Sequence, residues 1–175
     1  EDQTAGRQVQ MNMLPESPWV AGEFAFEHQI IPSLYLSGDF ADYFRVDERR
    51  IAFYLADVSG HGASSAFVTV LLKFMTTRLL FEFKRGSKMR EFKPSQVLSH
   101  INRGLINCKL GKHVTMVGGV IDEDTGLLTY AVGGHLPLPV LHTPEHTRYL
   151  EGRGLPVGVV GEATYQNLVV ELPPQ

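Results

Sequence analysis

The stretch Ala56-Asp57-Val58-Ser59-Gly60-His61-Gly62 organises the rest of the chain. The apolar residues 51–56 before it are typical of a buried strand, and the small residues 63–66 after it suit the first turn of a closely packed helix. Gly60 and Gly62 allow a sharp turn between the two, because glycine reaches backbone conformations that are closed to other residues. Asp57 is therefore expected where a strand ends and a helix departs.

A second acidic group lies upstream, in Ser37-Gly38-Asp39-Phe40-Ala41-Asp42. A turn at residues 46–49 falls roughly midway between Asp39 and Asp57, which predicts a hairpin that brings both carboxylates to one end of a sheet. Two carboxylates that meet without an obvious cationic partner indicate a site for a hard divalent cation. Oxygen ligands of this kind suit Mg²⁺ or Mn²⁺.

These two motifs, Gly-Asp-Phe-x-Asp and Asp-Val-Ser-Gly-His-Gly, resemble the signature of the SpoIIE/RsbU-type branch of bacterial PP2C-like serine/threonine phosphatases. Further segments resemble the same family in order along the chain: Val9-Gln10 with Leu14-Pro15, Pro94-Ser95-Gln96-Val97-Leu98 with Ile101-Asn102, Gly133-Gly134-His135-Leu136-Pro137, and Gly154-Leu155-Pro156-Val157-Gly158. A more particular similarity is to the output domain of a response regulator that controls the stability of the stationary-phase sigma factor.

The resemblance implies an α+β fold, a PP2C-like two-sheet β-sandwich flanked by helices with two Mg²⁺ or Mn²⁺ ions at one end. Asp57 would bridge the two ions, and Asp39 and the main-chain carbonyl of Val58 would hold one of them. His61 could donate a proton to the leaving oxygen, and Asp42 could orient Asp39 or a water; a purely structural role is an equal alternative for both residues. His135 is interpreted as a turn histidine rather than a catalyst.

The sequence departs from the family pattern after its last strand. The family carries a further aspartate there in an Asp-Gly motif, commonly with one more near its end, and the residues up to Gln175 supply neither. We therefore expect a phosphatase domain at 16–175 that lacks its C-terminal segment, or a phosphatase-like domain with weak or no activity. Ser37 also replaces a usual glycine, which should crowd the backbone only slightly.

Composition narrows the partners and the compartment. The net charge of −3 gives no reason to expect nucleic acid or an anionic membrane. Neither an apolar run long enough to cross a bilayer nor a secretory signal is present. A single cysteine, Cys108, is compatible with the reducing cytoplasm and is expected to be a small buried apolar group.

Residue patterns predict helices at 4–14, 62–84 and 94–108 and strands at 24–28, 42–46, 51–58, 115–121, 127–132, 138–142, 147–150 and 167–172. The long middle helix is expected to bury a face formed by Ala66, Val70, Phe74, Thr77 and Phe81, thickened by Phe67, Leu71, Met75 and Leu79. Residues 84–90 form a basic loop, expected to be solvated, with a docking surface for an acidic partner as the less favoured alternative.

The first 15 residues allow two interpretations. Thr4 could cap a short helix that packs on its own domain. Alternatively, this helix is the tail of a signalling helix from an upstream receiver-type domain, or a contact in a homodimer.

The leading hypothesis is a cytoplasmic, Mg²⁺/Mn²⁺-dependent protein serine/threonine phosphatase that acts as the output module of a bacterial signalling protein. Its substrate would be a phosphorylated regulator of the anti-anti-sigma type. The rival hypothesis is a catalytically silent domain of the same fold that binds a sigma factor or an adaptor. A calcium-stabilised structural sandwich is a weaker third reading, because the acids at 122–124 lack the spacing of a calcium loop.

Overall fold

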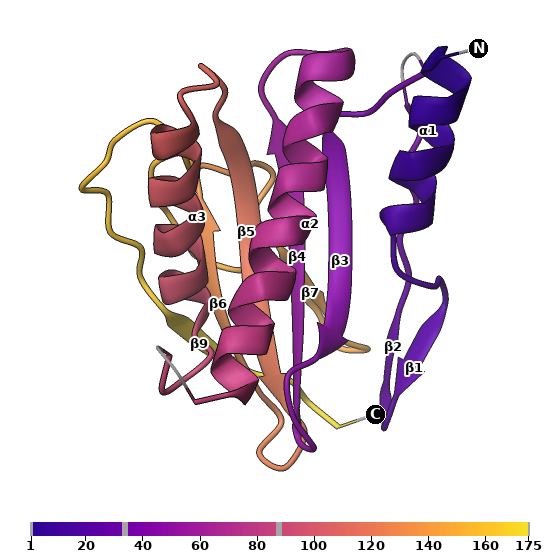
Figure 1. The fold of residues 1–175 in the computed structure, drawn as a ribbon. Helices are drawn as coiled ribbons and strands as arrows, with labels where there is room; N and C mark the ends of the chain where they lie inside the picture. Colours follow the sequence, from indigo (N-terminus) through magenta and orange to yellow (C-terminus); the bar gives the residue numbers. More distant parts are fainter. Residues whose placement is uncertain (1, 33–34, 87–88, 175) are drawn as a thin grey trace.

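The structure is a computed structural model that describes residues 2–32, 35–86 and 89–174 (Figure 1). Its helices are α1 (Asp2–Met13), α2 (Ala63–Lys84) and α3 (Pro94–Cys108). Its strands are β1 (Trp19–Ala21), β2 (Phe24–Phe26), β3 (Asp39–Arg45), β4 (Arg50–Val58), β5 (Val114–Asp122), β6 (Leu127–Gly133), β7 (Val140–His142), β8 (Thr147–Tyr149) and β9 (Leu168–Glu171). This α+β arrangement agrees with the order of elements expected from the sequence.

Five strands form the central antiparallel sheet in the order β3-β4-β5-β6-β9. Strands β3 and β4 make the expected hairpin, closed by a bond from the Val46 amide to the Arg50 carbonyl (2.9 Å). Its register sets Phe40 opposite Ala56 and Asp39 opposite Asp57. Because both acids lie at the hairpin's open end, they sit at one end of the sheet, beside the start of α2.

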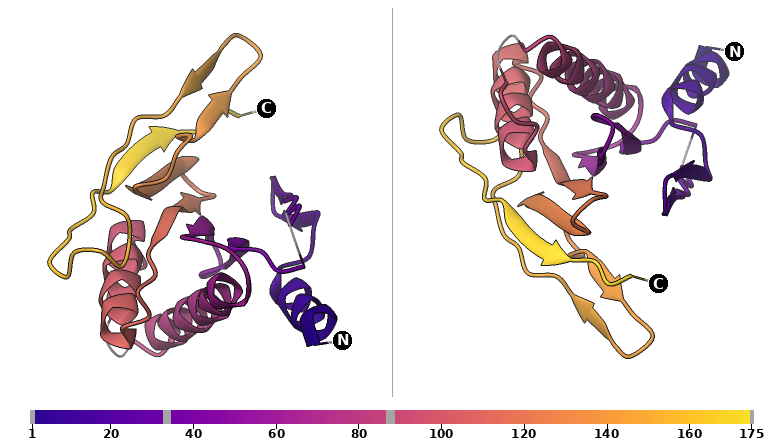
Figure 2. Two further views of the ribbon diagram at one scale, coloured as in Figure 1. Left: turned by 90° about the horizontal axis from the view of Figure 1, so that it is seen from above. Right: turned by 90° about the horizontal axis from the view of Figure 1, so that it is seen from below.

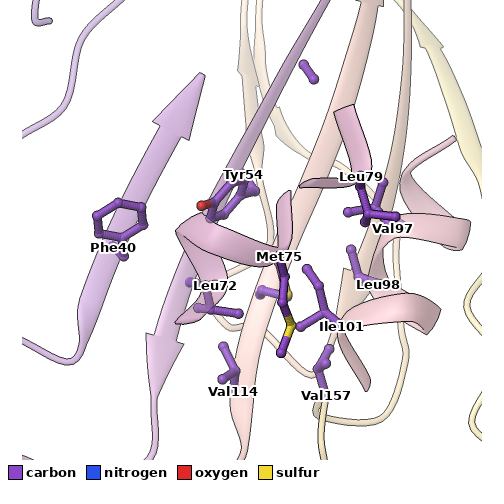
Figure 3. Close-up of a cluster of buried hydrophobic side chains, with 14 of the residues drawn as sticks. Phe40, Tyr54, Leu72, Met75, Leu79, Val97, Leu98, Ile101, Val114 and Val157 are labelled. Carbon is purple, nitrogen blue, oxygen red and sulfur yellow. The ribbon is translucent and has the colours of Figure 1, made fainter. Parts of the chain in front are cut away.

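Helices α2 and α3 cover one face of this sheet, and the main core lies between them and the strands (Figure 3). Leu72 of α2, Leu98 and Ile101 of α3, and Met116 of β5 are all fully buried there. Because α2 packs closely against the sheet, the position of its first residue relative to β4 is fixed. The path of the turn that joins β4 to α2 is fixed with it.

The opposite face of the sheet is covered by two small two-stranded sheets, β1-β2 and β7-β8 (Figure 2). A second cluster fills this side, in which Val117 and Tyr130 of the central sheet pack with Phe26 of β2 and Leu141 of β7. Strand β1 was not expected from the sequence, since its three residues are too few to give a pattern.

The buried face expected for α2 was wrong. Phe67, Phe74 and Phe81 are exposed, and the residues that face the core are Ser65, Ala66, Val68, Thr69, Leu72, Met75, Thr76 and Leu79. Several of these inward side chains are small, which lets the helix backbone approach the sheet closely. Ala66, Met75 and Leu79 were placed in the core correctly, and Leu71 packs against the core while partly buried.

Two smaller expectations also fail. Helix α1 already includes Asp2, so Thr4 lies within the helix rather than at its cap. Cys108 is exposed at the end of α3 and is not a buried apolar group. Among the described residues, none of the helices is both long and apolar enough to span a bilayer.

Candidate metal centre

Asp39 and Asp57 face each other across the first pair of strands, and both side chains are exposed at the sheet end. A bond from the Val58 amide to the Gly38 carbonyl (3.0 Å) continues the pairing one step further. The Asp39 amide donates to Ser37 Oγ (2.9 Å), which fixes the chain just before the strand. The expected meeting of the two carboxylates at one end of the sheet is therefore confirmed.

The turn from β4 to α2 is held by bonds to Ser59. Its amide donates to the His113 carbonyl (2.9 Å), and its own carbonyl accepts from Ser65 Oγ (3.0 Å) and Lys112 Nζ (3.1 Å). Gly60 has a positive φ of 81°, which a residue with a Cβ would adopt only with strain. The turn is thus a fixed structure that sets where Asp57 and Val58 lie.

The charges of Asp57 and His135 both act on the Asp39 carboxyl at this end of the sheet. Burial raises the pKa of the Asp39 carboxyl above its usual value, the negative charge of Asp57 raises it further, and His135 lowers it. His135 reaches the site from the turn after β6 and lies 3.3 Å from Thr115 Oγ1, where Thr115 is the residue paired with Asp57. Its place beside the acids was missed, because only strand pairing brings it there.

The donors at this site fit a hard cation in part. Two carboxylates repel each other, and the main-chain carbonyl of Val58 lies beside them: a Cβ placed on Gly38 would approach its oxygen to 3.0 Å. A divalent ion would relieve that repulsion. Within the described ranges, however, no cluster of three or more acidic, histidine or cysteine side chains could hold a metal. The described residues therefore suit one loosely held ion rather than a complete two-ion centre.

His61 lies on the same turn, between the two glycines, and its side chain is exposed. Among the described residues it has no hydrogen-bond partner, so the structure gives it no bond that would orient the ring. Its suggested role as a proton donor stays a prediction.

Comparisons with known proteins identify the family of this chain. The family model described as Stage II sporulation protein E (SpoIIE) matches residues 47–175. The chain belongs to the SpoIIE family. This agrees with the SpoIIE/RsbU-type PP2C-like resemblance of its motifs.

Relatives found by sequence and by structure agree with this assignment. The phosphoserine phosphatase RsbP of Bacillus subtilis is 26% identical over 162 residues, which cover 92% of this chain and 39% of RsbP. The RsbU and RsbW domains of a Mycobacterium tuberculosis protein match 80% of this chain and 37% of that one, with 26% identity and a TM-score of 0.62.

The PP2C domain of SiaA from Pseudomonas aeruginosa covers 99% of this chain, which in turn covers 67% of that one, with a TM-score of 0.71 at 17% identity. At that identity the likeness shows the fold alone. This SpoIIE-type chain spans well under half the length of RsbP.

Of the two alternatives expected for Asp42, its surroundings in this SpoIIE-type domain support the structural role, and they do not support an orienting contact with Asp39. Asp42 lies three residues along β3, and its side chain points to the opposite face of the sheet, under α2. Asp42 is 2% exposed, its Oδ2 lies 2.7 Å from Lys73 Nζ, and its Oδ1 accepts from the Tyr43 amide (3.0 Å). Its environment is that of a buried ion pair that joins β3 to α2.

Gln10 of α1 lies near the site, although the sequence had indicated it only as part of a family-like segment. Its buried amide group donates to the Ser37 carbonyl (2.6 Å) and accepts from the Ser37 amide (3.0 Å), so it pairs with Ser37 as a neighbouring strand would. The same Nε2 lies 2.9 Å from Thr69 Oγ1 on α2. Since Ser37 in turn binds the Asp39 amide, α1 is connected to the acidic end of the sheet.

Proposed function

We propose that this chain is the catalytic part of a Mg²⁺/Mn²⁺-dependent protein phosphatase that removes phosphate from phosphoserine or phosphothreonine. The observation that carries this proposal is the pairing of Asp39 with Asp57 at the open end of the β3-β4 hairpin, where burial and the charge of Asp57 raise the pKa of the Asp39 carboxyl. Two like charges held together cost stability, and a cation would relieve that cost.

The chemistry requires a nucleophile and neutralisation of phosphate charge, because phosphate monoesters are very inert to water. Bound divalent ions supply both functions. On this chain Asp57, Asp39 and the Val58 carbonyl would hold and orient the ion. The bonds of Ser59 to Ser65 and Lys112 would keep this turn in place, so that the ligands need not rearrange on binding. His61, on the same turn, would supply the proton that the leaving serine oxygen needs.

The substrate that we propose is a phosphorylated regulator of the anti-anti-sigma type, in a cytoplasmic pathway that controls a sigma factor. RsbP, a relative by sequence, is a phosphoserine phosphatase, which supports the phosphoserine class. An upstream regulatory domain of the receiver type would act through the N-terminal segment at 1–15, and the phosphatase domain at 16–175 would be its output. The bonds from Gln10 to Ser37 support α1 as the route from one to the other.

A second candidate is a binding domain of the same fold without activity. It is favoured by the absence, within the described residues, of any further carboxylate or histidine that completes a metal cluster with Asp39 and Asp57. In that case the domain would hold a sigma factor or an adaptor, and the acidic pair would serve no reaction.

Two measurements separate the candidates. The first is Mn²⁺ titration calorimetry on the 175-residue chain: we expect weak binding that Asp57→Asn removes, while Asp124→Asn, at an exposed hairpin turn, leaves it unchanged. Equal binding by the wild type and Asp57→Asn dismisses the metal site.

The second measurement is Mn²⁺-dependent phosphate release by the intact parent protein. The substrates are p-nitrophenyl phosphate and a phosphoserine protein, and Asp57→Asn should abolish the reaction. An inactive parent protein that still binds a sigma-pathway regulator would establish the binding domain instead.

A further inference from the structure

Helix α2 presents a row of aromatic side chains on the side opposite the core. Phe67, Phe74 and Phe81 are 61%, 62% and 57% exposed, and Val70 beside them is 36% exposed. We call these four residues the aromatic ridge. Figure 2 shows α2 at the margin of the molecule, where no other described element covers its outer side.

The ridge is too large to be an ordinary scatter of exposed apolar side chains. A phenylalanine carries on the order of 200 Å² of surface. At their exposed fractions, the three phenylalanines of the ridge together leave roughly 350 Å² of aromatic area in water. That is similar to the largest apolar patch of a typical monomer, and a patch of this size is often functional. A single exposed apolar residue would need no such explanation.

The spacing of the ridge is symmetric. Phe67, Phe74 and Phe81 are seven residues apart, the interval that returns to one side of a helix in a paired-helix seam. If a second copy of α2 packs antiparallel with a two-fold axis at Phe74, then Phe67 of each copy meets Phe81 of the other. Self-complementarity of this kind is what a two-fold interface requires.

Charge favours the same antiparallel arrangement. The antiparallel arrangement keeps apart the basic ends of the two helices, where Lys84 and Arg85 lie, and sets each beside the start of the other α2, whose first turn carries no charged residue. The Arg85 guanidinium already lies 5.3 Å from the Phe81 ring centre, at the end of the ridge. A parallel arrangement would instead place the two basic ends against each other.

The two cations within the length of the ridge, Lys73 and Arg78, are already balanced, and Lys73 is paired with the buried Asp42 (2.7 Å). Arg78 forms an ion pair with Glu82 of its own helix (3.1 Å), so its charge has a partner when a second helix covers it. Its aliphatic stem would lie opposite Val70 of the other copy and extend the apolar contact.

We propose that the aromatic ridge is a homodimer interface, in which two α2 helices pair antiparallel about Phe74. The inference is independent of any phosphatase activity. The ridge from residue 67 to 81 is about 21 Å long, and its aromatic area is roughly half of what one partner buries in a standard interface. We therefore expect a weak dimer, with a dissociation constant on the order of 10–100 µM.

Sedimentation equilibrium of the 175-residue chain tests this interface. Phe74→Glu places two like charges against each other on the axis, so the variant should be monomeric at concentrations where the wild type is mainly dimeric. Val20→Glu is the matched control, because Val20 is 70% exposed on β1 and should leave dimerisation unchanged. Circular dichroism and thermal unfolding should show that both variants fold, since both sites are exposed. A wild type that stays monomeric up to about 1 mM, or a Phe74→Glu variant that still forms dimers, overturns the proposal.

Disulfide trapping tests the direction of pairing. In a Cys108→Ser background, which removes the exposed native thiol, Phe74→Cys should form a dimer with itself on mild oxidation. A mixture of the Phe67→Cys and Phe81→Cys proteins should form the mixed disulfide faster than either forms a disulfide alone. Faster pairing of Phe67→Cys with itself would show parallel helices and overturn the proposed arrangement.

Discussion

Strand β3 carries two aspartates that have opposite surroundings only three residues apart. Asp39 lies at the open sheet end, exposed, with Asp57 as its neighbour. Asp42 lies on the other face of the same strand, 2% exposed and bonded to Lys73 and to the Tyr43 amide. One carboxylate is left beside a like charge, and the other is neutralised.

This difference separates what the fold needs from what a ligand needs. A buried carboxylate is tolerated only with a counter-ion and hydrogen bonds, and Asp42 has both. The Asp39–Asp57 pair contributes repulsion rather than stability, so it is an arrangement that an added cation would complete. Proteins commonly retain such unfavourable groups at functional sites.

The largest effect should follow when the buried Asp42 loses its counter-ion, Lys73. Lys73→Met leaves Asp42 buried and charged, and should lower the free energy of unfolding by about 3 kcal/mol, the low end for a broken buried pair because Lys73 is partly open to water. Chemical denaturation measures this. The double variant Asp42→Asn/Lys73→Met, which removes both charges, should recover most of the loss. If it recovers none, Asp42 is not the reason for the loss.

The same variant should show a characteristic pH dependence. Burial already raises the pKa of Asp42 in the wild type, despite Lys73. A carboxyl whose pKa is raised in the folded state binds its proton more tightly there than in the unfolded chain. Stability is therefore greatest below the unfolded value of about 4 and falls as the pH rises through the folded pKa. The loss caused by Lys73→Met should accordingly be full at neutral pH and shrink toward pH 4.

The Asp39–Asp57 pair should respond in the opposite manner: substitution there should change metal binding strongly and stability little. Asp57→Asn should weaken Mn²⁺ binding by about 100-fold or more, beyond what the loss of an indirect ligand contact costs. Its unfolding free energy without metal should stay within about 0.5 kcal/mol of the wild type, as for other exposed positions. A variant that keeps its Mn²⁺ affinity but unfolds readily would reverse the assignment of the two aspartates.

Whether each part of this contrast could be predicted from the sequence depends on how far apart the contacting residues lie along the chain. The β3-β4 hairpin followed from its turn and its apolar pattern, so the meeting of Asp39 with Asp57 could be predicted. Lys73 lies 31 residues from Asp42 on a separate element, and no local pattern indicates which charge it will meet. His135 reaches the site only because β6 pairs with β5.

The buried face of α2 was mispredicted for a related reason. The helix is apolar on both sides, so the spacing of its large side chains fits two orientations equally. Ser65 and Thr69 face inward because small side chains allow the helix to pack closely on β3 and β4. Packing against the sheet therefore decides which face of α2 is buried, and Phe74 lies on the exposed face.

A smaller effect should come from the connection between α1 and the acidic end. Gln10→Ala leaves the buried Ser37 amide and carbonyl without the partners that Gln10 provides, which should cost about 2 kcal/mol. Mn²⁺ affinity should fall by roughly 10-fold, because Ser37 positions the Asp39 backbone. Gln8→Ala is the matched control on the exposed side of the same helix, where Gln8 bonds only Asn12 among the described residues. Equal effects of the two variants would show that α1 is not coupled to the site.

The smallest effect should be a gain in stability at the open site. Burial and the charge of Asp57 raise the pKa of Asp39, so its ionised form is unfavourable in the folded protein. Asp39→Asn removes that charge and should raise the unfolding free energy of the metal-free protein by less than about 1 kcal/mol, since water screens this exposed pair. The sign of the pKa shift requires the gain to be absent below about pH 4, where Asp39 is protonated in both states, and to grow toward neutral pH. Asp124→Asn removes one negative charge elsewhere, so it corrects for the change in net charge. If Asp39→Asn is no more stable than Asp124→Asn at neutral pH with chelator present, the carboxylates of Asp39 and Asp57 do not repel each other enough to favour the binding of a cation.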